Sequence, residues 1–146
     1  MKKLNNLFLA LLILAPIPAT CLAQCAVRTI PVSRVEGTVV DPSGEPIPNV
    51  EVNLKQDGKV IPSITADEAG RFSLSVSPGK YDLNANAKGF VSGFARIDVG
   101  HDSVRLFKST HLWMFLDVGM LEDHCTFTTT SHSEFEKEIQ EHKKRN

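Results

Sequence analysis

Short stretches in which apolar and polar residues alternate recur along the middle of this chain. The apolar members of these stretches are Val50, Val52 and Leu54; Phe72, Leu74 and Val76; Tyr81, Leu83, Ala85 and Ala87; and Ala95, Ile97 and Val99. A period of two puts the apolar side chains on one face of a β-strand. The pattern therefore predicts strands that are buried on one face.

Turn-forming residues separate these stretches at short intervals. They are Asp57-Gly58, residues 67–70, Ser77-Pro78-Gly79, Lys88-Gly89 and Gly100. Asp57-Gly58 is the best hairpin signal, because a type I′ turn needs a positive φ at both central residues. Short strands at this spacing predict an all-β sandwich. We expect its core to contain Val52, Leu54, Phe72, Leu74, Tyr81 and Leu83.

The segment DPSGEPIP, residues 41–48, predicts a connection between two sheets rather than a hairpin. Asp41 can bond its own backbone to start a turn, and Gly44 can take a positive φ. Pro46 and Pro48 hold the residues before them extended and offer no N–H to a β-ladder. We therefore expect the chain to leave one sheet here and to enter the other.

Residues 1–23 have the features of a secretory signal peptide. Lys2 and Lys3 precede an unbroken apolar run at 7–14, and Cys21 and Ala23 put small residues at the cleavage site. The run is much shorter than the roughly 20 residues of a membrane span. Lipidation at Cys21 or Cys25 is the less favoured alternative, because neither follows a small residue. We expect a periplasmic or extracellular protein that begins at Gln24.

Cleavage there leaves Cys25 and Cys125. In an oxidising compartment an isolated pair is most simply a disulfide. A metal site formed by Cys125 with His124, His111 or His101 is the competing interpretation, but their spacing matches no metal-binding motif. We expect the disulfide and no metal.

Taken together, the turn and core residues resemble the carboxypeptidase regulatory-like domain family over about residues 34–100. The matching residues are Gly37, Asp41, Gly44, Pro46, Pro48, Asp67, Gly70, Phe72, Pro78, Gly79, Tyr81, Gly89 and Phe90. The resemblance implies a transthyretin-like (prealbumin-like) fold, a seven-stranded antiparallel Greek-key sandwich. Members accompany peptidase domains, extend outer-membrane receptors or stand alone. The resemblance therefore implies a fold and little chemistry.

The expected organisation is a signal peptide at 1–23, a lead-in at 24–33, the sandwich at 34–120 and a polar tail at 121–146. Strands are expected at 104–107 and 112–118. The tail should hold a linker at 126–131 and a helix at 133–145, because Ser133 and Glu136 form a capping box.

The strand at 112–118 is apolar on both faces, with Trp113 and Phe115 on one of them. Such a strand must be covered on both faces. We expect the segment after Val118 to fold back over these rings and to bury most of Trp113; the alternative is that they form a surface for a partner. Trp113 and Phe115 are therefore the candidate interaction patch.

The sequence contains no catalytic constellation that we can identify. His101, Asp102 and Ser103 are consecutive, so their side chains diverge on an extended chain. The 122–124 group, Glu-Asp-His, is more typical of a solvated loop, and Asp41, Asp57, Asp67 and Glu68 lack the spacing of a calcium loop. We expect no cofactor.

Charge and composition bear on the partners. Lys plus Arg number 16 against 17 Asp plus Glu, which favours neither nucleic acid nor anionic lipid as a partner. The sequence favours a non-catalytic module that binds a protein or serves as a structural or accessory domain of the cell envelope. The alternative is a carbohydrate-binding module in which Trp113, Phe115 or Tyr81 stacks on a sugar.

Overall fold

The computed structural model describes residues 28–61, 63–100, 111–119 and 126–145. These residues form ten β-strands and a C-terminal helix. The strands are β1 (Thr29–Val32), β2 (Val35–Val40), β3 (Glu51–Gln56), β4 (Lys59–Val60), β5 (Ile64–Thr65), β6 (Arg71–Leu74), β7 (Gly79–Asn86), β8 (Gly93–Val99), β9 (His111–Phe115) and β10 (Phe127–Thr129), and the helix is α1 (His132–Arg145).

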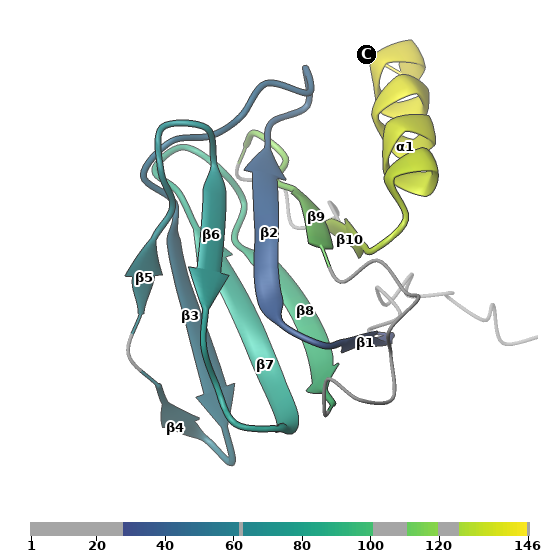
Figure 1. Cartoon of the computed structure of the whole chain (residues 1–146). Helices are drawn as coiled ribbons and strands as arrows, with labels where there is room; N and C mark the ends of the chain where they lie inside the picture. Colours follow the sequence, from purple (N-terminus) through teal and green to yellow (C-terminus); the bar gives the residue numbers. More distant parts are fainter. Residues whose placement is uncertain (1–27, 62, 101–110, 120–125, 146) are drawn as a thin grey trace, which may run out of the picture.

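The strands form two sheets that face each other (Figure 1). Sheet A has the order β1-β8-β7-β3-β4, with β5 also paired to β3. Sheet B has the order β10-β9-β2-β6. Helix α1 follows β10 and lies outside sheet B, on the side of β9 and β10 (Figure 1). The predicted all-β sandwich is confirmed.

The pairing differs from the expected seven antiparallel strands. The described residues alone hold ten strands, and the pairs β1–β8 and β2–β9 are parallel. A parallel pair requires a long crossover, which both pairs have, because their members are far apart in the chain. Strands β1 and β10 lie in the expected lead-in and tail, so the sandwich extends past both ends of 34–120.

The main core lies between the sheets and contains the side chains expected from the alternation. Val52, Leu54 and Leu83 are fully buried, and Phe72 and Tyr81 are nearly so. Leu74, at the end of edge strand β6, is only half-buried and packs against this core. The register inferred from the period of two is therefore correct.

Asp57 and Gly58 form the predicted hairpin turn. Both have a positive φ, 49° and 77°, and the turn joins β3 to β4 with Gln56 opposite Lys59. These are the conformations that a type I′ turn requires.

Residues 41–48 cross between sheets as predicted, from β2 in sheet B to β3 in sheet A. The crossing contains a local reversal that we did not expect, because Val40 and Pro46 form an antiparallel bridge. Pro46 needs no N–H for this bridge. The neighbouring N–H of Ile47 donates to the Val39 carbonyl at 3.0 Å.

The tail helix begins one residue before the expected start, and its cap is different. Ser131 is the N-cap: its hydroxyl accepts from the Glu134 N–H at 3.4 Å. The Glu134 carboxylate in turn accepts from the Thr129 hydroxyl at 3.0 Å. The expected box of Ser133 and Glu136 is therefore wrong, and the Ser131 N–H donates to the Thr129 hydroxyl at 3.1 Å instead of to Glu134. The 126–131 segment is not only a linker, because it contains β10.

Several expectations lie outside the described residues. They are the signal peptide at 1–23, Cys25, Cys125, the strand at 104–107, and the groups at 101–103 and 122–124. The disulfide and the cleavage site therefore stay predictions. Within the part of the chain that is described, no helix has both the length and the apolar character needed to cross a membrane.

Candidate interaction surface

Strand β9 divides its side chains between two environments, as its sequence predicted. Leu112 and Met114 point into the main core and are fully buried, as is Leu116 just beyond the strand. Trp113 and Phe115 lie on the opposite face, outside sheet B, where α1 packs. The question raised by the sequence is therefore how much of this outer face α1 covers.

Phe115 does not offer a free surface. It is 3% exposed and belongs to a second apolar cluster with Val40 of β2 and with Phe135 and Ile139 of α1. The helix thus covers the part of sheet B that surrounds Phe115. The tail therefore folds back over Phe115 as expected, and Phe115 is inaccessible while α1 is docked, whereas Trp113 is less completely covered.

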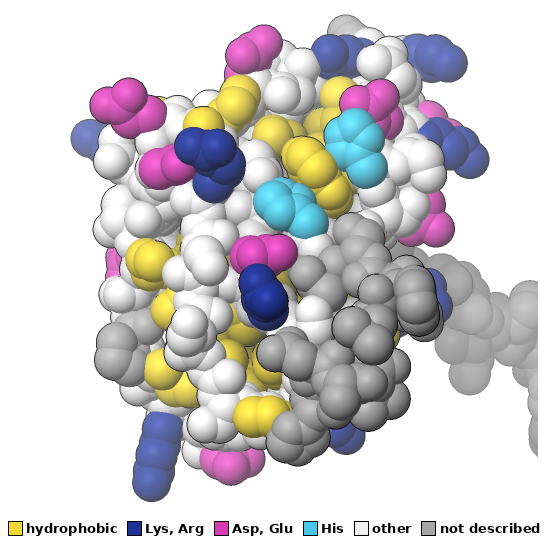
Figure 2. Space-filling model, in the orientation of Figure 1, with side chains coloured by type: hydrophobic (Ala, Val, Ile, Leu, Met, Phe, Trp, Pro, Cys, Tyr) yellow, Lys and Arg dark blue, Asp and Glu magenta, His cyan; other side chains and the backbone are white. Residues whose placement is uncertain are grey.

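Trp113 is only half-buried, at the edge of the helix contact. Its ring lies 4.7 Å from the ring of His111, 4.5 Å from that of His132 and 5.6 Å from that of Phe135, measured between centroids. His132 is the first residue of α1 and His111 the first of β9. Histidine and hydrophobic side chains accordingly lie together on this face (Figure 2).

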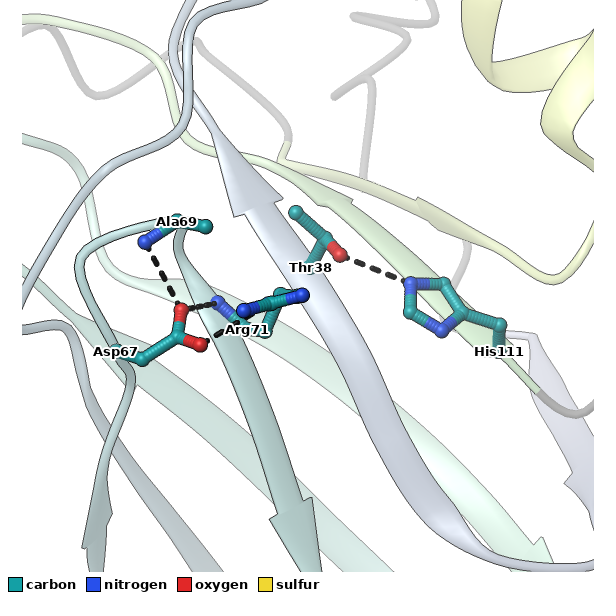
Figure 3. Close-up of polar contacts among 5 residues, drawn as sticks. All are labelled: Thr38, Asp67, Ala69, Arg71 and His111. Carbon is teal, nitrogen blue, oxygen red and sulfur yellow. Dashed lines mark hydrogen bonds and ion pairs between the residues drawn. The ribbon is translucent and has the colours of Figure 1, made fainter.

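Polar side chains continue this surface across sheet B, away from the helix. The strand register places Arg71 of β6 beside Thr38 of β2, and Thr38 beside Trp113 of β9. Oγ1 of Thr38 lies 2.9 Å from Nε2 of His111 (Figure 3). We call Thr38, Arg71, His111, Trp113 and His132 together the sheet B surface.

Arg71 is held in place by Asp67. Its Nε donates to Oδ2 of Asp67 at 2.9 Å, and its side chain is still 68% exposed. Figure 3 shows the guanidinium extending from Asp67 toward Thr38. An exposed guanidinium in a fixed position is suited to contact a partner.

Burial lowers the pKa of His111 below its usual value, and the charge of His132 lowers it further. Glu36, which lies opposite His111 in the register, acts in the other direction. His111 is therefore neutral at neutral pH. Thr38 is itself buried, so its hydroxyl fixes the orientation of the imidazole rather than facing a substrate.

The motif residues Asp41 and Asp67 build two turns of the same design. In each, the N–H of the glycine three residues on, Gly44 or Gly70, donates to the aspartate carbonyl at 3.0 Å. One carboxylate oxygen of each aspartate also accepts backbone N–H groups, at 2.8 and 2.9 Å for Asp41 and at 2.9 Å for both bonds to Asp67. These carboxylates stabilise turns. In the described ranges, no group of His, Cys, Asp and Glu is placed to hold a metal.

The remaining motif residues also serve the fold. A Cβ on Gly37 would meet the Leu112 carbonyl and the Phe72 ring, so only glycine fits there. Gly89 has a φ of 90°, and Phe90 bridges to Val118 beside it. Gly79 begins β7, after Pro78, and Pro48 lies in the crossing from β2 to β3.

Tyr81 is 3% exposed, and its hydroxyl donates to the Ser77 carbonyl at 2.7 Å. It cannot stack on a sugar from this position. Of the rings considered for sugar binding, only Trp113 reaches the surface.

Sequence reasoning named Trp113 but missed the residues around it. His111 was within reach, because it alternates with Trp113 and Phe115 and so shares their face. Thr38 and Arg71 were not, because their proximity depends on pairings between strands that are distant in the chain.

The fold and this use of its residues define a small β-sandwich module whose motif residues build turns and core. A sequence model described as the carboxypeptidase regulatory-like domain matches residues 34–107. The chain belongs to this family, as its motif residues indicated.

The chain was also compared with solved structures and with curated proteins. A solved structure of Klebsiella pneumoniae 5-hydroxyisourate hydrolase is similar to this chain at 20% sequence identity and a TM-score of 0.45, covering 64% of this chain and 96% of the hydrolase. A likeness at this level says nothing about activity. A sequence search of curated proteins finds no match.

Proposed function

We propose that this protein is an exported, non-catalytic accessory module of the cell envelope that acts by binding another protein through the sheet B surface. Family membership supports an accessory role. The basic and apolar pattern of residues 1–23 supports export, to the periplasm or the cell exterior.

The half-buried Trp113 is the observation that carries the binding proposal. It lies on the outer face of a sheet, fixed by neighbouring rings, with the exposed Arg71 two strands away in sheet B. Tryptophan and arginine are enriched among residues that dominate binding energy in protein interfaces. A tryptophan that is already held in one orientation loses little conformational entropy on binding.

Site-specific photo-crosslinking in envelope fractions tests this proposal. A photoreactive side chain at position 111, beside Trp113, should give a discrete crosslinked product. The same group at position 60 is the control, because Val60 is 64% exposed but lies in β4, at the edge of sheet A. Equal products from both positions, or none from position 111, would contradict binding at this surface.

A titration of Trp113 fluorescence with oligosaccharides separates this function from sugar binding. The chain has a single tryptophan, so its emission reports on this surface alone. We expect no saturable response, because neighbouring rings already contact Trp113. A saturable response would favour a carbohydrate-binding module instead.

A further inference from the structure

All the histidines that lie in the described part of the chain are at one interface. They are His111, His132 and His142, and each contacts an aromatic ring between α1 and sheet B. Histidine is the side chain whose charge changes between about pH 5 and 8. An interface built around three such side chains is a candidate for control by protons.

The two ends of α1 meet the sheet in different ways. At its first residue, His132 packs on Trp113, which also contacts His111. Near its last residue, His142 packs on Phe115 at 5.0 Å, with its Nε2 3.8 Å from Oδ1 of Asp117. His142 and Asp117 are both buried. The first end therefore places two imidazoles around one indole, whereas the second places an imidazole beside a carboxylate.

We propose that protonation of His111 loosens the first turn of α1 from sheet B, while the contacts of His142 with Phe115 and Asp117 hold the last turn in place. The helix then pivots about its C-terminal end in mildly acidic conditions. Trp113 and Phe127, which are partly covered when α1 is docked, become more accessible.

The charged groups around the first turn of α1 determine whether protonation weakens or strengthens its contact with sheet B. Each histidine has a carboxylate near it: Glu36 for His111, and Glu136 for His132 at 3.5 Å. Glu136 belongs to the helix itself and would move with it. Among the other charged groups, Arg71 is paired with Asp67, and Glu134 accepts from Thr129. A proton on His111 would meet the positive charge of His132 across the contact, and this repulsion disfavours the docked state.

Proton linkage gives the same sign. Burial and the neighbouring His132 make His111 harder to protonate when α1 is docked, so its pKa is below its usual value. When the first turn moves away, the charge of His132 moves away from His111 with it. The loosened state then binds the proton more readily. The docked state is therefore favoured above about pH 6.5 and loses this advantage as the pH falls below it.

The single tryptophan allows a direct experiment. Trp113 emission is followed from pH 8 to pH 5, together with amide hydrogen exchange along α1. We expect the emission to change below about pH 6.5 and to be quenched more strongly by acrylamide there. Amides 135–138 should lose protection, and amides 141–144 should keep it. Changed emission with unchanged exchange would overturn the proposal, as would unchanged emission.

Three variants separate the proposed mechanism from a general effect of charge. His132→Gln should move the emission midpoint to lower pH or remove the transition, because the charge that disfavours a protonated His111 in the docked state is gone. His111→Gln should abolish the transition. Lys137→Gln removes a positive charge from the exposed face of the same helix and should leave the midpoint unchanged. An unshifted midpoint in His132→Gln contradicts the proposal. If His111→Gln fails to fold, the result for His132→Gln is sufficient to decide the question.

Discussion

At the scale of single residues, the family motif acts through backbone geometry. Asp41 and Asp67 each hold a five-residue turn closed, and Gly37 lets two strands and a phenyl ring approach closely. The roles of such residues can be predicted from sequence, because each turn depends on a few neighbouring residues. The environment of Trp113 could be predicted only in part: the tail was expected to cover it, but Thr38 and Arg71 are distant in the chain and reach it through strand pairing.

Asp67 should make the stability of the sandwich depend on pH in acid. Hydrogen bonds lower its pKa, chiefly the one from the Arg71 N–H. Its carboxylate therefore contributes stability above about pH 4, and this contribution is lost as the pH falls through the lower folded pKa. We expect Asp67→Asn to be less stable than the wild type at pH 7 and the difference to shrink by pH 3. Urea unfolding at both values measures it; a constant difference would contradict this account.

Gly37→Ala should destabilise the sandwich by about 1 to 3 kcal/mol, the usual range for overpacking. The new Cβ would meet the Leu112 carbonyl and the Phe72 ring, and the carbonyl belongs to a strand paired on both sides. Urea unfolding measures the loss. Ser73→Ala, at an exposed position of β6 in the same sheet, is the matched control and should be nearly neutral. Equal effects would mean that Gly37 is not needed for close approach.

At the scale of elements, strands were predictable and their partners were not. The alternation in β3, β6, β7 and β8 follows from burial on one face, which is a local property. Strands β1 and β10 lack such alternation over enough residues to be recognised. The parallel pairs β1–β8 and β2–β9 join segments that are far apart in the chain, so no local pattern indicates them. The helix was predictable, but its cap was assigned to Ser133, whereas Ser131 caps it in the structure.

The main core and the small cluster under α1 should unfold in separate steps. Phe72→Ala opens a cavity in the main core and should destabilise the whole sandwich by about 3 to 5 kcal/mol. Phe135→Ala removes a ring from the small cluster under α1, and a helix this short is marginal without docking. We expect this variant to lose helical circular dichroism while its sheets unfold at nearly the wild-type urea concentration. A common loss of both signals would mean that α1 is part of the main cooperative unit.

At the scale of the whole molecule, the proposed export makes two predictions about the covalent structure of the mature chain. Mass analysis of the exported protein should give Gln24 as its first residue, with no acyl chain. Non-reducing peptide mapping should find Cys25 linked to Cys125, a bridge that stabilises by about 4 to 5 kcal/mol in the chain-entropy model. An acylated first cysteine, or two free thiols, would contradict the assigned compartment and the closure.

The central claim is that the protein works by binding a partner at Trp113. The most direct test is the dissociation constant of the crosslinked partner, once purified, for the wild type and for Trp113→Ala, with Val60→Ala as the control. We predict that Trp113→Ala stays folded and binds about 30-fold more weakly or worse, which corresponds to the loss of about 2 kcal/mol that defines a hot spot. Val60→Ala should bind like the wild type. An unchanged dissociation constant for Trp113→Ala would contradict the account.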